Sequence, residues 1–267
     1  MANSLSGESV IERTVKILRA FGRDTPKLTM SELARSTGLS TSTTHRLATE
    51  LLDAGLLERD PEGRLGVGIQ MWELAARSNP AEDFRRRGLP VLEGIHAAVR
   101  QHVSLSIPRF ESHSVLYLER LDQHGTASIL AEVAGRLDMH TTSAGLTMMA
   151  HAPHPVQERF LSTDLERVTP STDIDPISIR SHLALIRERG YSCLKGVLVE
   201  SNVAYSVPVF GVRNAVVGAI AVVTPVAEDS PQLIIPVLVA AGHSLSRTMG
   251  AEKRPYGNRS WLDEGRS

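Results

Sequence analysis

Apolar residues recur at helical spacing in the first eighty residues and alternate with turn signals. This pattern predicts a set of short amphipathic helices. The first helix begins after Ser9, because Ser9 and Glu12 have the spacing of a capping box. Apolar residues between positions 10 and 21 then line one face of this helix, which we expect to pack on the segment that follows.

The segment 28–57 predicts two helices joined by a tight turn. Thr29 begins the first of them with a second capping box, and Gly38 suits the left-handed residue that ends it. Ser40 is a suitable N-cap for the next helix, whose leucines recur at helical spacing. Two helices joined in this way predict a helix-turn-helix, which places its second helix in the major groove of DNA.

Candidate DNA contacts lie on the polar face of the second helix and on a hairpin behind it. Residues 56–67 form two short runs around a turn at 61–63, which predicts a β-hairpin, the wing of a winged helix-turn-helix. Hydroxyl groups can bond phosphates or base edges, and arginine can bond guanine or phosphate. The alternative is a small helical domain with solvated hydroxyls. The predicted contacts are Thr29, Ser40, Thr41, Ser42, Thr43, His45, Arg46, Thr49, Arg59 and Arg64.

A domain boundary is predicted near residue 80. Residues 69–77 fit a short linker helix, which ends at the Ser-Asn-Pro sequence of 78–80. We therefore expect a DNA-binding domain over 1–68, a linker over 69–80, a second domain over 81–250 and a mobile polar tail over 251–267.

The second domain mixes strands with helices, which predicts an α+β fold. In the strand 114–121, alternation places Val115, Tyr117, Glu119 and Leu121 on one face. A helix begins at the Asp-Pro pair of 175–176 and stops at a glycine. The expected helices are 84–100, 144–151, 156–161, 176–189 and 233–249, and the expected strands are 103–108, 114–121, 126–133, 203–210 and 216–224.

Composition and charge limit the way this chain can bind nucleic acid. The 267 residues are 42% hydrophobic, which is enough for two domains, and the net charge is −1. Residues 1–79 hold ten Lys or Arg and ten Asp or Glu, which argues against a strong nonspecific binder of nucleic acid. The segment 40–49 carries Arg46 and no acid, so specific binding by a dimer remains compatible with the charge.

The single cysteine, Cys193, permits no intramolecular disulfide and no cysteine-rich metal site. The longest apolar runs are too short to span a bilayer, and the first ten residues lack the character of a signal peptide. We therefore expect a soluble cytoplasmic protein without a cofactor.

Four segments carry a resemblance to a known family: 28–47 with the hairpin 56–68, then 134–145, 186–192 and 204–210. Through them the chain resembles the isocitrate-lyase-regulator (IclR) transcription factors over nearly its full length. The resemblance implies a winged helix-turn-helix, a linker helix and a GAF-like effector-binding domain. It also implies dimers or dimers of dimers.

The sequence departs from this family at several positions. The family often has Lys in place of Thr41, an apolar residue in place of Thr44 and Pro in place of Asp138. The Thr44 hydroxyl therefore needs a hydrogen-bond partner. Where the family has an acidic pair that lines the ligand pocket or orders its lid, this chain has Gly196 and Val197. We expect a ligand other than the small oxo-acid of the best-known members, and a more apolar ligand is a hypothesis.

A cluster of hydroxyl side chains precedes the helix expected from about residue 144. Hydroxyls and unpaired N–H groups at a helix N-terminus suit a carboxylate, because the helix dipole also favours an anion. The alternative is ordinary helix capping by one of these hydroxyls. With the resemblance, the cluster predicts a site for an organic acid or an aromatic metabolite. Its expected residues are His140, Thr141, Thr142, Ser143, Ala144, Gly145, Asn202, Ala204 and Ser206.

Other candidates for chemistry are weaker. A proline breaks helical spacing between His151 and His154, so a metal site is not favoured. The arginines at 85–87 fit a solvated helix face better than a DNA contact, and Cys193 fits a buried structural thiol better than a sensor. Without a phosphate loop, a nucleophile elbow or metal-ligand spacing, we assign no catalytic residue. An enzyme domain fused to a DNA-binding module is the remote alternative, and it predicts turnover of the ligand.

Together these features predict a ligand-responsive regulator that binds a palindromic DNA operator as a dimer or a dimer of dimers. A small molecule in the second domain would shift the population between dimer geometries that fit the operator and geometries that do not. Repression of a catabolic or metabolic operon is the first expectation, and activation by the same architecture is the alternative.

Overall fold

The computed structural model describes residues 7–22, 24–77, 79, 81–122 and 129–252. The chain divides into two compact units, residues 1–80 and 81–267, and each is described by itself. Most of the tail expected over 251–267 lies outside the described residues, as do positions 78 and 80 of the expected boundary.

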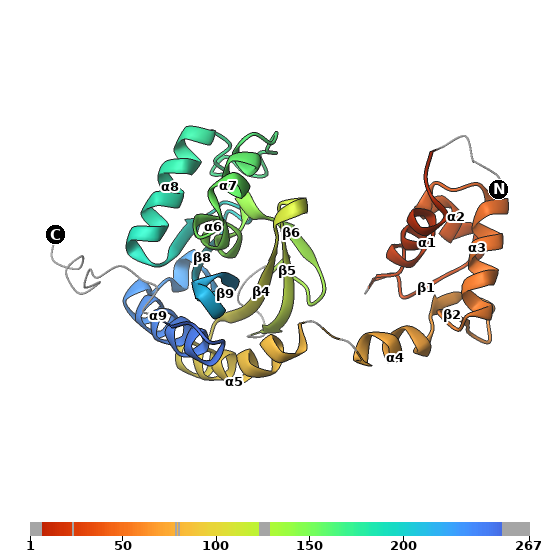
Figure 1. The fold of residues 1–267 in the computed structure, drawn as a ribbon, viewed down its shortest axis with the longest axis horizontal. Helices are drawn as coiled ribbons and strands as arrows, with labels where there is room; N and C mark the ends of the chain where they lie inside the picture. Colours follow the sequence, from red (N-terminus) through yellow and green to blue (C-terminus); the bar gives the residue numbers. More distant parts are fainter. Residues whose placement is uncertain (1–6, 23, 78, 80, 123–128, 253–267) are drawn as a thin grey trace. The chain divides into compact units, whose positions relative to one another are not determined.

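The first unit is a helix-turn-helix with a three-stranded sheet (Figure 1). Its helices are α1 (Val10–Arg19), α2 (Met30–Thr37), α3 (Thr41–Asp53) and α4 (Ile69–Arg77), and its strands are β1 (Lys27–Leu28), β2 (Leu57–Arg59) and β3 (Leu65–Val67). The sheet has the order β1-β3-β2, so the wing hairpin is confirmed, whereas β1 was not expected.

Local sequence signals explain where these helices begin and end. Both expected capping boxes are formed, at the start of α1 and of α2. Gly38 ends α2 with φ 66°, and the side chain of Ser40 accepts a hydrogen bond from the Thr43 amide at the start of α3. Apolar residues from every helix except α4 and from all three strands meet in one core. Its buried members are Ile17, Leu28, Leu33, Leu47, Ala48, Leu51, Leu57 and Leu65.

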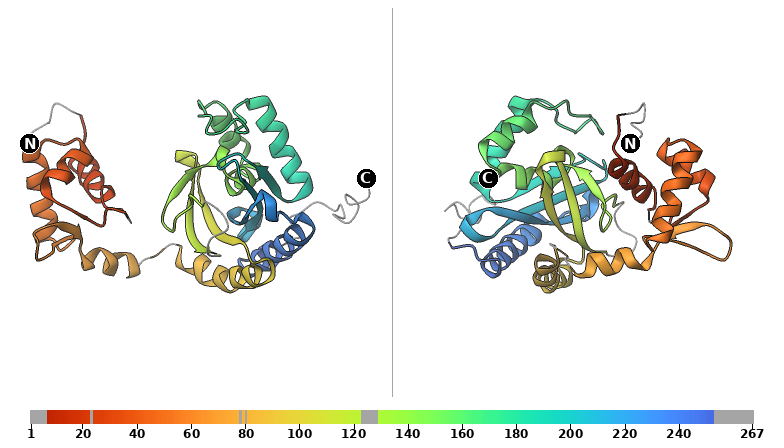
Figure 2. Two further views of the ribbon diagram at one scale, coloured as in Figure 1. Left: turned by 180° about the vertical axis from the view of Figure 1, so that it is seen from behind. Right: turned by 45° about the vertical axis from the view of Figure 1, so that its right-hand side comes forward.

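The second unit is a six-stranded antiparallel sheet with helices on both faces (Figure 1). Its order is β6 (Arg136–Asp138), β5 (Ser114–Leu121), β4 (His102–Arg109), β9 (Val216–Pro225), β8 (Asn202–Phe210) and β7 (Ser192–Lys195). Helices α5 (Glu82–Val99) and α9 (Pro231–Thr248) contact each other and lie together in both further views (Figure 2). Helices α6 (Ser143–Ala150), α7 (His154–Leu161) and α8 (Pro176–Arg189) pack against one another on the opposite face.

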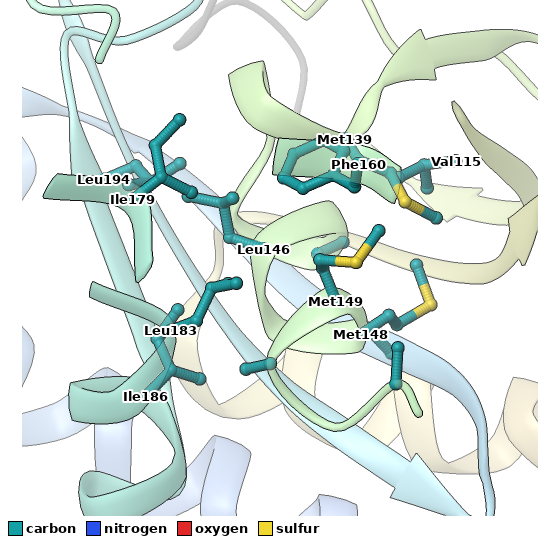
Figure 3. Packing of buried hydrophobic residues seen from close by; sticks show 14 of the residues in the cluster. Val115, Met139, Leu146, Met148, Met149, Phe160, Ile179, Leu183, Ile186 and Leu194 are labelled. Atoms are coloured by element: carbon teal, nitrogen blue, oxygen red, sulfur yellow. The ribbon is translucent and has the colours of Figure 1, made fainter. Parts of the chain in front are cut away.

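Helix α6 is the centre of the core on its side of the sheet, and all eight of its residues are buried. Figure 3 shows Leu146 of this helix next to side chains of α8, while Met139 and Phe160 pack toward Val115 of the sheet. The backbone also approaches closely here, because a Cβ at Gly145 would lie 2.3 Å from the carbonyl oxygen of Met139. The start of α6 is therefore fixed in place by packing.

Strand β5 is interrupted by a β-bulge, which overturns one expectation. Leu105 of β4 pairs with Glu119 and the next residue, Ser106, pairs with Tyr117, so Leu118 is the extra residue. The sequence placed Tyr117 and Glu119 on one face, and this was wrong because the bulge reverses the alternation beyond it. Tyr117 lies in the core under α6, whereas Leu118 packs in the core under α5 and α9.

Two further expectations need correction. A strand was expected over 126–133, but residues 129–133 form none, and 126–128 lie outside the described residues. Cys193 is exposed rather than buried, because Ser192 and Leu194 point inward on the edge strand β7 and Cys193 points outward between them. Among the described helices, none combines the length and apolarity needed to cross a membrane.

Candidate functional site

The polar face of α3 is open to solvent. Thr41, Ser42, His45 and Arg46 are exposed and Thr49 is half-buried, while the leucines of the helix lie in the core. The face therefore presents hydroxyl, imidazole and guanidinium groups together. Thr44, in contrast, is fully buried and donates its hydroxyl to the carbonyl of Ser40 at 3.0 Å, which is the partner that this hydroxyl needed.

Several of the predicted DNA-contact side chains already form hydrogen bonds inside the unit. Thr29 is exposed but bonds Glu32 within its capping box, and Ser40 bonds Thr43. Thr49 donates to the His45 carbonyl at 2.9 Å. Hydroxyls have further lone pairs, so these bonds do not prevent a second contact with DNA.

Each arginine predicted at the DNA surface also has a partner within the protein. Arg46 pairs with Glu50 one turn later on α3, with 2.6 Å between Nη1 and Oε1. In the wing, Arg64 pairs with Asp60 at 3.1 Å, and Arg59 donates to the carbonyl of Gly63 at 3.0 Å. The pairs are solvent-exposed on the arginine side and therefore weak, so DNA phosphates can compete for these cations.

In the second unit a cavity of about 70 Å³ lies beside the N-terminus of α6. Roughly 10–15 Å³ suffices for one water molecule, so this volume suits a small organic ligand. Its walls come from all six strands of the sheet, from the segment before α6 and the first residue of that helix, and from the loops at 129–131 and 197–199. The lining residues are His102, Val103, Ser104, Tyr117, Arg120, Ile129, Leu130, Ala131, Leu137, Thr141, Thr142, Ser143, Leu194, Val197, Leu198, Val199, Asn202, Ala204, Ala221 and Val223.

Hydroxyl groups at the start of α6 form one polar part of this cavity. Thr142 is the N-cap, because its Oγ1 accepts from the Gly145 amide at 3.1 Å, and it also donates to the carbonyl of Asp138 at 3.2 Å. Thr141 donates to the same carbonyl. Ser143 is 3% exposed and also lines the cavity. Helix capping by Thr142, the alternative interpretation of these hydroxyls, is therefore confirmed, and an anion site beside it stays a prediction.

The residues predicted for the effector site do not all reach the cavity. Thr141, Thr142, Ser143, Asn202 and Ala204 line it. The other four lie outside the lining: His140 bonds the Glu166 carbonyl through Nε2, Ser206 bonds Thr147 of α6, and Ala144 and Gly145 are packed in the helix start.

The sheet contributes a second polar part, which the sequence did not predict. His102 of β4 is 7% exposed, and its Nδ1 lies 3.0 Å from Oδ1 of Asp122. The other carboxylate oxygen of Asp122 lies 2.7 Å from Nη2 of Arg120. Burial acts to raise the pKa of Asp122, but the hydrogen bond from His102 and the Arg120 guanidinium outweigh it, so this pKa lies below its ordinary value.

No local signal in the sequence marks these residues. His102 stands at the first position of its strand, and Arg120 faces the cavity only because of the bulge at Leu118. His102 begins β4 and Asp122 directly follows β5, so only the register of these two strands shows that the side chains meet. Within the part of the chain that the structure describes, no group of three or more His, Cys, Asp or Glu side chains is placed to hold a metal ion.

Comparison with known proteins gives a consistent result for both units. The family model described as "IclR helix-turn-helix domain" matches residues 10–61. The model described as "Bacterial transcriptional regulator IclR C-terminal" matches residues 80–247.

Individual relatives cover most of the chain. It is similar to an IclR homolog from Microbacterium hydrocarbonoxydans, whose crystal structure is a complex with 4-hydroxybenzoate. The identity is 34%, the TM-score is 0.83, and the match covers 90% of this chain and 99% of the other. It is also similar to the HTH-type transcriptional regulator XynR of Escherichia coli, at 26% identity over 90% of this chain and 96% of that protein. The glycerol operon regulatory protein of Streptomyces coelicolor is 25% identical over 90% of this chain and 96% of its own length.

Proposed function

The chain belongs to the IclR family of bacterial transcriptional regulators, which are not enzymes, and we propose from this that it represses a catabolic or metabolic operon in response to a small organic acid. The observation that carries this proposal is the cavity of the second unit, which is enclosed by apolar side chains and has hydroxyls at a helix N-terminus. We place its action on chromosomal DNA in the cytoplasm.

For DNA recognition we propose that α3 enters the major groove and that the wing follows the phosphate backbone. The exposed face with Thr41, Ser42, His45 and Arg46 supports this assignment. One such helix reads only a few base pairs, so we propose a dimer or a dimer of dimers that reads a palindromic operator. The balanced charge of the first 79 residues supports specific rather than general binding.

For the effector we propose an aromatic carboxylic acid. The structural relative with 34% identity was crystallised with 4-hydroxybenzoate, and the cavity of this chain lies against Leu, Val and Ile side chains that suit a ring. The carboxylate then lies at the N-terminus of α6, where Ser143 and the helix dipole favour an anion. Effector binding shifts the population between dimer geometries and thereby controls operator affinity.

The experiment that tests this proposal is a selection of genomic fragments by the purified full-length protein, followed by sequencing. One enriched palindromic site, released when an aromatic acid is added, is the expected result. Enrichment that increases with the acid would instead favour activation by the same architecture. A uniform distribution of fragments at low salt, with and without the acid, would contradict specific operator binding.

A further inference from the structure

A buried nitrogen of His102 has no partner among the described residues. His102 is 7% exposed and lines the cavity, and its Nε2 is buried without a hydrogen bond. A buried polar atom that stays unpaired costs free energy, so such an atom on a residue that lines a ligand cavity points to a group that the ligand supplies.

The neighbours of His102 determine which kind of hydrogen bond its Nε2 makes. Asp122 accepts through a carboxylate, so the Nδ1 that faces it carries the proton. Arg120 binds the second oxygen of Asp122, and the guanidinium balances the carboxylate charge. When the ring is neutral and carries its proton on Nδ1, Nε2 is an acceptor.

An acceptor at this place discriminates between the polar groups of a ligand. A carboxylate has no proton to donate and would face the lone pair of Nε2, whereas a hydroxyl donates to it. The carboxylate of the ligand instead binds at the other polar part of the cavity, where Ser143 lies at the start of α6. The two polar parts therefore prefer different groups of one ligand.

We propose that His102 accepts a hydrogen bond from a hydroxyl group of the effector, so that the cavity selects a hydroxylated aromatic acid over the same acid without the hydroxyl. Asp122 and Arg120 are positioning residues, which hold the ring of His102 in the tautomer that accepts. This inference rests on the proposed function of the cavity as the effector site.

The test is calorimetric titration of the full-length protein with four probes: 4-hydroxybenzoate, 3-hydroxybenzoate, benzoate and 4-methoxybenzoate. The methoxy compound keeps the oxygen and loses only the proton, so it separates donation from shape. We expect one hydroxybenzoate to bind at least about tenfold more tightly than both benzoate and 4-methoxybenzoate, because the latter two leave Nε2 unpaired.

The variant His102→Phe keeps a ring and removes the acceptor, so it should reduce this preference to about threefold or less while benzoate still binds. The matched control is His96→Phe on α5, where Nδ1 bonds the Gln101 carbonyl at 2.8 Å and the ring lies outside the cavity lining. This control should keep the full preference. If His102→Phe does not fold, the methoxy comparison on the natural protein still tests whether the cavity requires a proton donated by the ligand, and equal affinity for the two compounds would overturn the inference.

Three further outcomes overturn the inference. Equal affinity of the natural protein for benzoate and the hydroxybenzoates would remove the role of His102 and leave the effector site intact. A preference that survives in His102→Phe would assign the hydroxyl to another group. If none of the four probes binds while the genomic selection still yields an operator, the hydroxylated aromatic acid is the wrong ligand class, although the regulator assignment holds.

Discussion

Replacing Glu50 by Gln should tighten operator binding, because Glu50 holds the arginine that we place in the groove. Arg46 and Glu50 form an i, i+4 pair on α3, and their side chains are 54% and 56% exposed. Such a pair contributes about 0.3–0.5 kcal/mol, and this stabilisation is lost when Arg46 leaves Glu50 to contact DNA. Two helices per dimer make the gain about 0.6–1 kcal/mol, which is roughly three- to fivefold in affinity.

Replacing Arg46 instead of Glu50 should change operator affinity in the opposite direction. Arg46→Ala should weaken binding by about 1–3 kcal/mol if Arg46 reads a base, with relaxed specificity at one position of each half-site. If Arg46 holds a phosphate, all sequences should weaken alike and the salt slope should fall by about one for each arginine lost. Fluorescence anisotropy with the selected operator at several salt concentrations separates the two roles.

A matched control is available on the linker helix. Arg77 and Glu73 of α4 form another exposed i, i+4 pair, so Glu73→Gln makes the same change of charge away from α3. It should leave operator affinity within about twofold of the natural protein. The reasoning is refuted if Glu50→Gln and Arg46→Ala both leave the affinity unchanged, because α3 would then present neither side chain to DNA.

Four other substitutions test stability and ligand response. Thr142→Val should weaken aromatic-acid binding in calorimetry and lower the free energy of unfolding by about 1 kcal/mol, because Thr142 caps α6. Ser143→Ala should weaken ligand binding alone. Equal unfolding temperatures for the two variants would contradict the role of Thr142 as a cap. Thr44→Val should change the free energy of unfolding by less than about 1 kcal/mol, because the Ser40 carbonyl that accepts from the Thr44 hydroxyl also accepts from the Thr44 backbone N–H. A larger loss of stability in urea unfolding would show that the hydroxyl makes a stronger bond. Burial and the nearby Arg187 lower the pKa of His151 from 6.5 to about 4. As the pH falls from 6.5 to 4, the unfolded state therefore binds the proton first, and the free energy of unfolding falls by up to roughly 3 kcal/mol. His151→Phe should reduce this pH dependence of the free energy of unfolding, measured at pH 7, 6 and 5.

The elements that the sequence predicted well are those with local causes. The N-cap at Asp175 and the left-handed Gly190 fixed both ends of α8, and Gly38 fixed the end of α2. The missed strands have no such cause. β1, β6 and β7 contain two, three and four residues and exist because other strands pair with them, so their own residues do not carry the information.

The same difference separates the two polar parts of the candidate site. The hydroxyls before α6 are adjacent in the sequence, and their place at a helix start could be read from it. The part on the sheet depends on the bulge at Leu118. In an unbroken strand, Glu119 would share the face of Tyr117 and bring a carboxylate toward a cavity that we assign to an acid. The bulge turns Glu119 to α5, where it pairs with Arg85 at 2.8 Å, and places Arg120 in the cavity lining instead. One unpaired residue in a ladder therefore exchanges an acidic side chain for a basic one in the cavity lining, and only the register of the folded sheet reveals it.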